Sequence, residues 1–368
     1  DAGKVGLDTP ITEYLPEFQM ADPRYKQITV RMLMDHTSGI LGTTNGDFMI
    51  FDDRDTQPHD TLLAELSTQR LKADPGDFAA YCNDGFELLE LITERVSGQS
   101  FTDYVERHIC KPLGMEQTGT AWNAFRTPEQ VATFQGSVRF ATDYCMDLGS
   151  GGMLSTAPEL CRFGSAFFKG NTTLLSEQSK KAMTTRSKAA EYEDGYGLGW
   201  DSVSYVDYDK AGVQVVSKGG DVLLQHSELL VAPDEEISVA VTSSGGSSMY
   251  NTMMSMALMD IALEEKGITV EHPEAAPVET LDAVPEKYFD YAGLYLDTSG
   301  LSQVSFPEGK YMEITTLTGD RPQTTQYLYT ADDRFVKMEG KIESGKAVQA
   351  KDQLLLHFGE RSGKTYII

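Results

Sequence analysis

Hydrophobic positions recur at helical spacing in some parts of the chain and form short extended runs in others. Helical spacing with cap or stop residues at the ends predicts helices over residues 28–40, 88–96, 101–109, 156–168 and 249–265. Apolar runs bounded by turn residues predict strands over 213–217, 223–232 and 237–242. Pro233-Asp234-Glu235-Glu236 has the composition of a hairpin turn between the last two. We therefore predict an antiparallel meander, against which the helix 249–265 packs.

Turn and helix-breaking residues predict the end of one helix and the position of one loop. Lys111-Pro112-Leu113-Gly114-Met115 predicts the end of the helix 101–109, because proline disfavours a helix interior. Residues 41–60 are polar, acidic and contain glycine, which indicates a loop over a functional site.

The composition changes near the last quarter of the chain. Residues 267–285 are rich in Pro, Glu, Ala and Thr, which is typical of a linker. Short alternating segments beyond it, separated by turn residues, predict a small β-barrel or sandwich. We expect a first domain over 1–268, a linker over 269–285 and a β-rich domain over 286–368.

Length and charge restrict the classes of partner. With 368 residues and 40% hydrophobic content, the chain can bury a substantial core. The net charge of -25, from 31 Lys plus Arg against 56 Asp plus Glu, argues against nucleic acid and anionic lipid as partners. No apolar run is long enough for a transmembrane segment. The chain begins Asp1-Ala2-Gly3-Lys4, without Met or an apolar leader, so we expect it to start after processing or a cut.

The four cysteines do not suggest a metal site. They lie far apart, without a Cys-x-x-Cys pair or a histidine at ligand spacing, at Cys82, Cys110, Cys145 and Cys161. Cys82 and Cys161 stand next to apolar helical positions, which indicates small core residues. We expect neither a metal nor a cofactor.

A tyrosine and an asparagine stand together before the helix 88–96. Tyr81 and Asn83 flank one residue, so on extended backbone their side chains point the same way. A phenol can carry a proton, with a pKa that a neighbouring cation could lower, and a carboxamide can hold a lysine or an amide substrate. By itself, this spacing is more often a turn residue beside a buried aromatic anchor.

Three other stretches carry candidate chemistry. Lys218-Gly219-Gly220-Asp221 ends the first predicted strand, where the glycines would let a ligand lie against the backbone beneath a lysine. His36 could be a catalytic base, but a histidine closing a helix C-terminus as a cation is the stronger interpretation, because no acid is placed to orient it. Gly149-Ser150-Gly151-Gly152 precedes a helix and could bind an anion, although close backbone packing explains its glycines equally well.

Five stretches in order resemble the serine β-lactamase and penicillin-binding-protein superfamily, on its class C, DD-peptidase and esterase-like branch. They are residues 28–39, Tyr81-Cys82-Asn83, residues 151–156, residues 195–200 and Lys218-Gly219-Gly220. The resemblance covers residues 1 to about 266 and implies an α/β fold with an antiparallel sheet flanked by helices. The tail from about Tyr288 is similar to the lipocalin-like domain that often follows such hydrolase domains.

The resemblance also implies roles for the motif residues. The family transfers acyl groups through a serine in Ser-x-x-Lys, without a metal. Tyr81 would shuttle protons, Asn83 would hold the lysine of that motif and the substrate amide, and Lys218 would favour the phenolate and attract a carboxylate. Gly219 and Gly220 would contact the substrate, and the N–H of Asp221 would form half of an oxyanion hole. The substrate would be a β-lactam, a D-amino-acid peptide or an ester, outside the cytoplasm.

One part of the family pattern is missing from these residues. No serine is followed three places later by lysine, and Thr185-Arg186-Ser187-Lys188 offers only a threonine, which we do not expect to be the nucleophile. In the family, the serine helix and two strands precede the position of Asp1. Either this chain is the later part of a longer hydrolase, or it is a homologue that binds cell-wall peptides without cleaving them. We favour the first, because a sheet without those strands would expose an unpaired edge and an apolar face.

Overall fold

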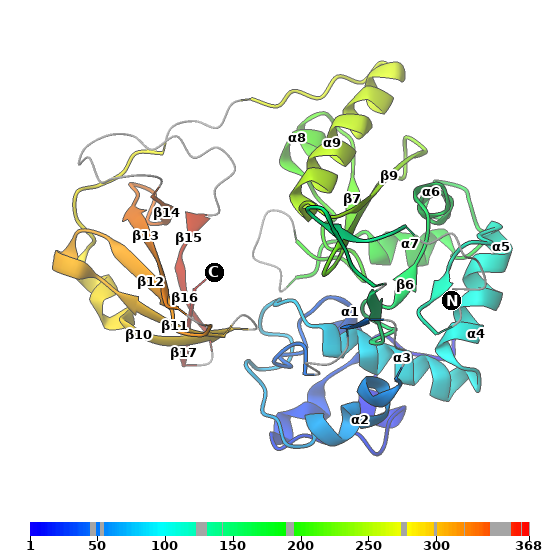
Figure 1. Ribbon diagram of the computed structural model, residues 1–368, viewed down its shortest axis with the longest axis horizontal. Helices are drawn as coiled ribbons and strands as arrows, with labels where there is room; N and C mark the ends of the chain where they lie inside the picture. The colour runs from blue at the N-terminus through cyan, green and yellow to red at the C-terminus, as the bar shows by residue number, and fades with distance from the viewer. Residues whose placement is uncertain are drawn as a thin grey trace. The chain divides into compact units, whose positions relative to one another are not determined.

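The computed structural model describes residues 1–44, 49–51, 55–122, 131–141, 143–188, 195–273, 278–297, 300–319, 321–338, 355–361 and 363–367. The chain forms two compact units, Asp1–Glu271 and His272–Ile368 (Figure 1). The boundary between them falls in the stretch expected to be a linker, of which residues 274–277 lie outside the described ranges.

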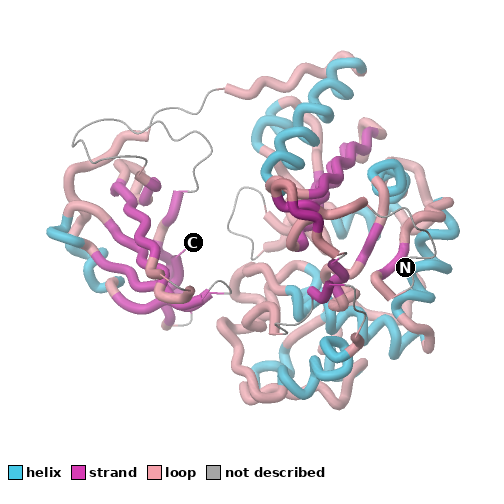
Figure 2. The backbone as a smooth tube through the Cα atoms, in the orientation of Figure 1, coloured by secondary structure: helices cyan, strands magenta, loops and turns pink. Residues whose placement is uncertain are grey.

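An antiparallel meander forms the sheet of the first unit (Figure 2). Its strands are β7 (Val216–Val222), β8 (Gln225–Ala232) and β9 (Ile237–Ser244). Alternate side chains of β8 enter two different cores, because successive residues of a strand point to opposite faces. Leu230 packs with α9 (Ser248–Glu265), whereas Leu229 packs in the cluster that includes Phe167, just beyond α6 (Ala157–Ser165). The expected antiparallel sheet between helices is confirmed.

The helix α9 has one buried and one exposed face. Asn251, Ser255, Met259 and Leu263, four residues apart, are buried. The opposite face exposes large apolar side chains at Met249, Tyr250, Met253, Met254, Leu258 and Ile261. Among the described strands β9 pairs only with β8, so its outer edge has no partner there.

A helical region packs beside this sheet in the same unit. It contains α1 (Val30–Met34), α2 (Gln57–Leu66) and α3 (Asn83–Ser97). Leu88 and Ile92 of α3 join a core that includes Leu33 of α1 and Leu62 of α2. The helix α3 therefore begins five residues earlier than predicted, at Asn83, and ends at Gly98, whose φ of 69° is the left-handed conformation that glycine favours.

The helix ends within the predicted stretch 111–115, but at Gly114 and not at Pro112, the residue expected to end it. The helix α4 (Phe101–Val105) continues through a π-helical turn, Glu106–Cys110, into α5 (Lys111–Leu113), and only Gly114 at φ 66° stops it. A π turn relaxes the normal hydrogen-bond register, which accommodates the N–H that Pro112 lacks.

Residues 41–60 are not a single loop. Met49–Phe51 (β1) pairs with Asp143–Cys145 (β5), and α2 already begins at Gln57, while residues 45–48 and 52–54 lie outside the described ranges. The remaining elements of the unit are short: Ile11–Glu13, Pro23–Gln27, β2 (Gly119–Thr120), β3 (Phe134–Gln135), β4 (Val138–Arg139), β6 (Met153–Leu154), α7 (Glu177–Met183) and α8 (Val206–Lys210).

The second unit is built on one antiparallel sheet whose strands follow chain order. They are β10 (Gly293–Asp297), β11 (Gly300–Ser305), β12 (Met312–Thr316), β13 (Gln323–Tyr329), β14 (Phe335–Lys337) and β15 (Leu355–Leu356). A hairpin of β16 (Phe358–Arg361) and β17 (Lys364–Ile367), with the 3-10 turns Glu286–Tyr291 and Pro307–Gly309, completes it. Phe358 contacts the rings of Tyr288 and Phe335, so an aromatic core joins the hairpin to the sheet.

Two expectations concern the chain as a whole. In the described parts, no helix has both the length and the apolar character that a bilayer crossing requires. Cys82, Cys110 and Cys145 are buried free thiols, and Cys161 is a partly buried one. Cys82 belongs to the core shared by α1, α2 and α3, as its apolar neighbours predicted.

Candidate active site

The structure brings Tyr81 and Lys218 together from distant parts of the chain. Tyr81 precedes α3, and Lys218 lies in β7 with its Nζ 5.9 Å from the centroid of the Tyr81 ring. Between Tyr81 and Asn83, Cys82 is extended (φ -151°, ψ 108°) and buried. Its burial anchors the segment, which leaves the residues on either side free to reach the surface.

The ring of His36 packs against the ring of Tyr81 and is uncharged. Its ring is buried, with centroids 4.4 Å from Tyr81 and 4.7 Å from Tyr196. Burial, and then the charges of Lys218 and Lys72, lower the pKa of His36 to about 3. Its Nδ1 accepts the backbone N–H of Cys82 at 3.0 Å, so the ring proton of the neutral form is on Nε2. The interpretation of His36 as a positive helix cap was therefore wrong, and its neutral ring packs against that of Tyr81.

Asp201 holds the lysine. The Nζ of Lys218 lies 3.0 Å from Oδ2 of Asp201, and the N–H of Gly219 donates to the same oxygen at 2.9 Å. Burial alone would lower the pKa of Lys218, but Asp201, Tyr81 and Glu228 outweigh it and raise the pKa, so the ammonium stays charged. Sequence reasoning missed Asp201, although it directly follows the motif that ends at Trp200.

The phenol of Tyr81 is neutral near pH 7, contrary to the expected phenolate. Desolvation raises its pKa, and the opposing effect of Lys218 does not compensate. Because 43% of Tyr81 is exposed, solvent moderates this shift. A second cation beside the ring would be needed to make the phenolate a substantial species.

Asn83 is the first residue of α3 and faces the segment before residue 45. Its Nδ2 donates to Oγ1 of Thr43 at 2.7 Å. The next residue, Asp84, accepts the backbone N–H of Thr44 at 2.9 Å and the hydroxyl of Thr44. Two neighbouring threonines therefore orient the first turn of this helix.

The outer edge of β7 presents backbone N–H groups. Ser217 donates its N–H to the carbonyl of Ser202 at 2.9 Å, and Gly219 donates to Asp201, both away from β8. Alternate residues of a strand direct their N–H groups to the same edge, so the N–H of Asp221 points to that side too. A Cβ on Gly220 would collide with Oγ of Ser227, which explains the glycine there.

The comparisons with known proteins decide the family. A family model described as Beta-lactamase matches residues 1–263. The chain belongs to the beta-lactamase family. This confirms the resemblance that the five motif stretches indicated.

Relatives of this beta-lactamase-family chain include named penicillin-binding proteins and a peptidase. The putative penicillin-binding protein PbpX of Bacillus subtilis is 29% identical over 53% of this chain and 48% of its own length. The D-alanyl-D-alanine-carboxypeptidase/endopeptidase AmpH of Escherichia coli is 27% identical over 73% of this chain and 71% of its own. The chain thus spans about half of PbpX. The crystal structure of SurE shares the fold, with a TM-score of 0.71, 20% identity, and coverage of 97% of this chain and 78% of that one.

Other sequence candidates of this family member have structural roles. The N–H groups of Gly149 and Ser150 donate to the carboxylates of Glu90 (2.7 Å) and Glu87 (2.6 Å), so this glycine turn is tied to α3 and does not await an anion. The hydroxyl of Thr185 donates to the carbonyl of Lys181 at 2.6 Å, beyond the end of α7. As expected, Thr185 belongs to a helix terminus and not to a nucleophile pair.

Proposed function

We propose that this chain forms the tyrosine, asparagine and lysine side of an acyl-transfer site in a serine hydrolase. The observation that carries the proposal is the charged Lys218, held by Asp201, 5.9 Å from the centroid of the Tyr81 ring. The substrate would be a D-amino-acid peptide, a β-lactam or an ester, and the reaction would pass through an acyl-enzyme.

The neutral phenol determines how the proton would move. The serine hydroxyl gives its proton to the oxygen of Tyr81 as it attacks the acyl carbon, while Tyr81 passes its own proton to the leaving group. Lys218 stabilises the negative charge that develops on the phenol oxygen during this exchange. Asn83 holds the lysine of the nucleophile motif, whose charge adds to that of Lys218, and the amide of the substrate.

The substrate would lie along the open edge of β7. The N–H of Asp221 supplies one donor of the oxyanion hole, and Gly219 and Gly220 let the acyl group approach the backbone. Lys218 attracts a substrate carboxylate, but Asp201 already balances part of its charge. D-alanyl-D-alanine peptides, which the name of AmpH gives as its substrate, would therefore fit at least as well as charged β-lactams, and we propose that the enzyme acts outside the cytoplasm.

The serine would come from a segment beyond these 368 residues, which contain no Ser-x-x-Lys. Two observations support this. The outer edge of β9 has no partner among the described strands, and the exposed face of α9 is apolar. Two further strands and a helix would cover both surfaces. The chain also spans only 48% of PbpX and 78% of SurE.

A second candidate is a binding protein for cell-wall peptides without hydrolytic activity. The same absence of Ser-x-x-Lys from the 368 residues favours it. The two candidates differ in whether a covalent intermediate forms.

Covalent labelling of the full-length gene product tests the proposal. We expect a fluorescent penicillin or a fluorophosphonate to label one serine, located by mass spectrometry of the peptides. Absence of labelling, under conditions that label a control hydrolase, together with saturable binding of a D-alanyl-D-alanine peptide, would establish the binding protein.

A further inference from the structure

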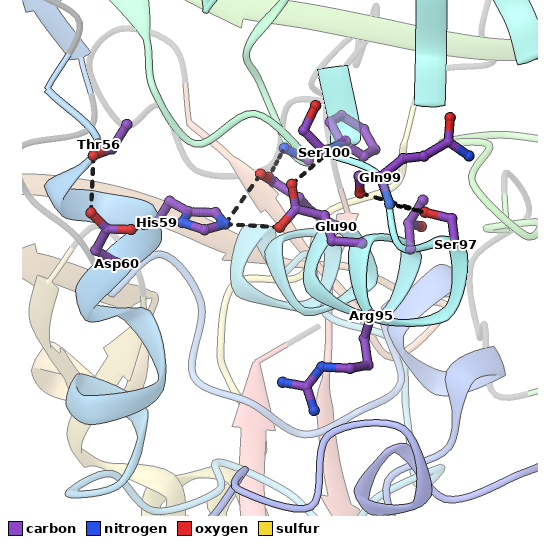
Figure 3. A network of polar contacts seen from close by, with 12 residues as sticks. Thr56, His59, Asp60, Glu90, Arg95, Ser97, Gln99 and Ser100 are labelled. Atoms are coloured by element: carbon purple, nitrogen blue, oxygen red, sulfur yellow. Dashed lines mark hydrogen bonds and ion pairs between the residues drawn. The ribbon is translucent and has the colours of Figure 1, made fainter. Parts of the chain in front are cut away.

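A histidine of α2 and two glutamates of α3 converge away from Tyr81 and Lys218. The Nε2 of His59 lies 3.4 Å from Oε2 of Glu94 and 3.8 Å from Oε1 of Glu90, and one atom of each of the three residues lies within 4.8 Å of the others. Figure 3 shows the ring of His59 pointing from its helix toward Glu90. Glu90 and Glu94 share a helix face because they are four residues apart.

Each of these groups is oriented by a neighbour on its far side. The Nδ1 of His59 lies 3.1 Å from Oδ1 of Asp60, which orients the ring so that Nε2 faces the glutamates. Glu90 accepts the N–H of Gly149, and Glu94 accepts the N–H of Phe101, each at 2.7 Å through the oxygen that does not face His59. Ligands held by outer hydrogen bonds in this way are typical of metal centres.

One carboxylate oxygen of the cluster is buried without a hydrogen-bond partner among the described residues. Glu90 is 1% exposed and its Oε1 accepts no hydrogen bond there, while the carboxyl of Glu87 is hydrogen-bonded to the Glu90 carboxylate. This oxygen points at His59. A buried carboxylate oxygen without a partner is costly, and a bound cation would satisfy it.

The arginine next to Glu94 in sequence does not fill this role. Arg95 follows Glu94 directly, but its guanidinium pairs with Glu17 and points away from the cluster (Figure 3). The side chains of His59 and Glu94 are both partly exposed, so an ion can reach the cluster from solvent.

We infer that His59, Glu90 and Glu94 bind one divalent transition-metal ion. Ligand atoms about 2.0–2.2 Å from a tetrahedral zinc ion lie about 3.4 Å apart, close to the two distances from Nε2. One imidazole nitrogen with two carboxylate oxygens suits Zn²⁺ or Mn²⁺ better than Mg²⁺ or Ca²⁺, which prefer oxygen alone. Water would complete the coordination. The ion would tie α2 to α3, the helix that begins with Asn83.

Titration calorimetry of the metal-stripped 368-residue chain with Zn²⁺ tests this inference. We expect one saturable site, a rise in Tm on binding, and visible absorption bands when Co²⁺ replaces Zn²⁺. His59→Gln and Glu94→Gln should each weaken binding at least tenfold and abolish the Tm rise. The two side chains are 29% and 28% exposed, so both variants should fold, which circular dichroism checks.

His108→Gln is the matched control. His108 is exposed in the π turn after α4, where its ring stacks on Tyr104, so its removal should leave Zn²⁺ binding unchanged. The inference is overturned if the chain shows no saturable site, or if His59→Gln and Glu94→Gln bind Zn²⁺ as the unsubstituted chain does. The three residues would then form a polar cluster without a metal ion. None of these readouts depends on acyl-enzyme formation.

Discussion

The two parts of α3 use polar residues in opposite ways. Tyr81, just before the helix, and Asn83, its first residue, are both at least partly exposed, and Thr43 orients the amide of Asn83. One to three turns further on, Glu87 and Glu90 are buried carboxylates that hold the backbone of the 149–150 turn. The comparison indicates that changes at the start should affect chemistry more than stability, and that changes further along should do the reverse.

Tyr81→Phe should have the largest effect at the start of the helix. Loss of a general acid and base lowers rates by about 10²–10⁴-fold, and we expect this loss in the rate of penicillin labelling of the full-length product. The Tm should hardly change, since the ring that stacks on His36 is kept. Tyr104→Phe, outside the site, is the control. Unchanged labelling in Tyr81→Phe would remove the phenol from the proton path.

Asp84 lies between the two parts of α3, because it belongs to the first turn but is buried like Glu87 and Glu90. Burial, opposed by hydrogen bonds from Thr44, raises the pKa of Asp84 to about 6. Between pH 4 and 6 the folded state keeps a proton that the unfolded state releases, so the free energy of unfolding falls as the pH rises. Asp84→Asn should remove the part of this dependence that Asp84 contributes, about 3 kcal/mol above pH 6, while the raised pKa values of Glu87 and Glu90 keep a slope of the same sign.

Urea unfolding from pH 4 to 8 measures the effect of Asp84→Asn. The exposed Asp103 supplies the control Asp103→Asn, which should leave the pH profile as it is. A profile that Asp84→Asn does not flatten would mean that another carboxyl dominates in this pH range.

Gly149→Ala should act on the second part alone. A Cβ at this position collides with the carbonyl of Phe86 and approaches Cβ of Glu90 at 2.9 Å. We expect a loss of about 1–3 kcal/mol in urea unfolding, as for other overpacked sites. Gly293→Ala, where an added Cβ meets nothing within 4 Å, should be neutral. A neutral Gly149→Ala would show that the turn is not tightly held against the helix.

Thr43→Val should have the smallest effect of these changes, and it tests whether the start of α3 serves chemistry more than stability. It removes the acceptor for Nδ2 of Asn83, a hydrogen bond worth about 0.5–1.5 kcal/mol. Because that bond orients the amide, labelling should slow several-fold while the free energy of unfolding changes little. A lower free energy of unfolding with an unchanged labelling rate would assign Thr43 to stability only.

The local sequence was sufficient for the elements whose signals are short-range. The turn at 233–236 and the apolar runs around it predicted the meander, because strand alternation and turn chemistry are local properties. The tyrosine, asparagine and lysine were named in advance because their motifs stand in family order. The helix ends in the predicted stretch 111–115, but at Gly114 and not at Pro112, because a local proline rule cannot anticipate a π turn.

Long-range contacts decided the rest. The sequence alone determined an α/β chain of the beta-lactamase type, and it predicted Tyr81, Asn83 and Lys218 as site residues. Only the tertiary structure revealed that Asp201 pairs with Lys218 and that His36 is neutral beneath Tyr81, because pKa values follow burial and neighbouring charges. The proximity of His59 to Glu90 could not be predicted from sequence spacing either, because the packing of α2 against α3 brings the two residues together.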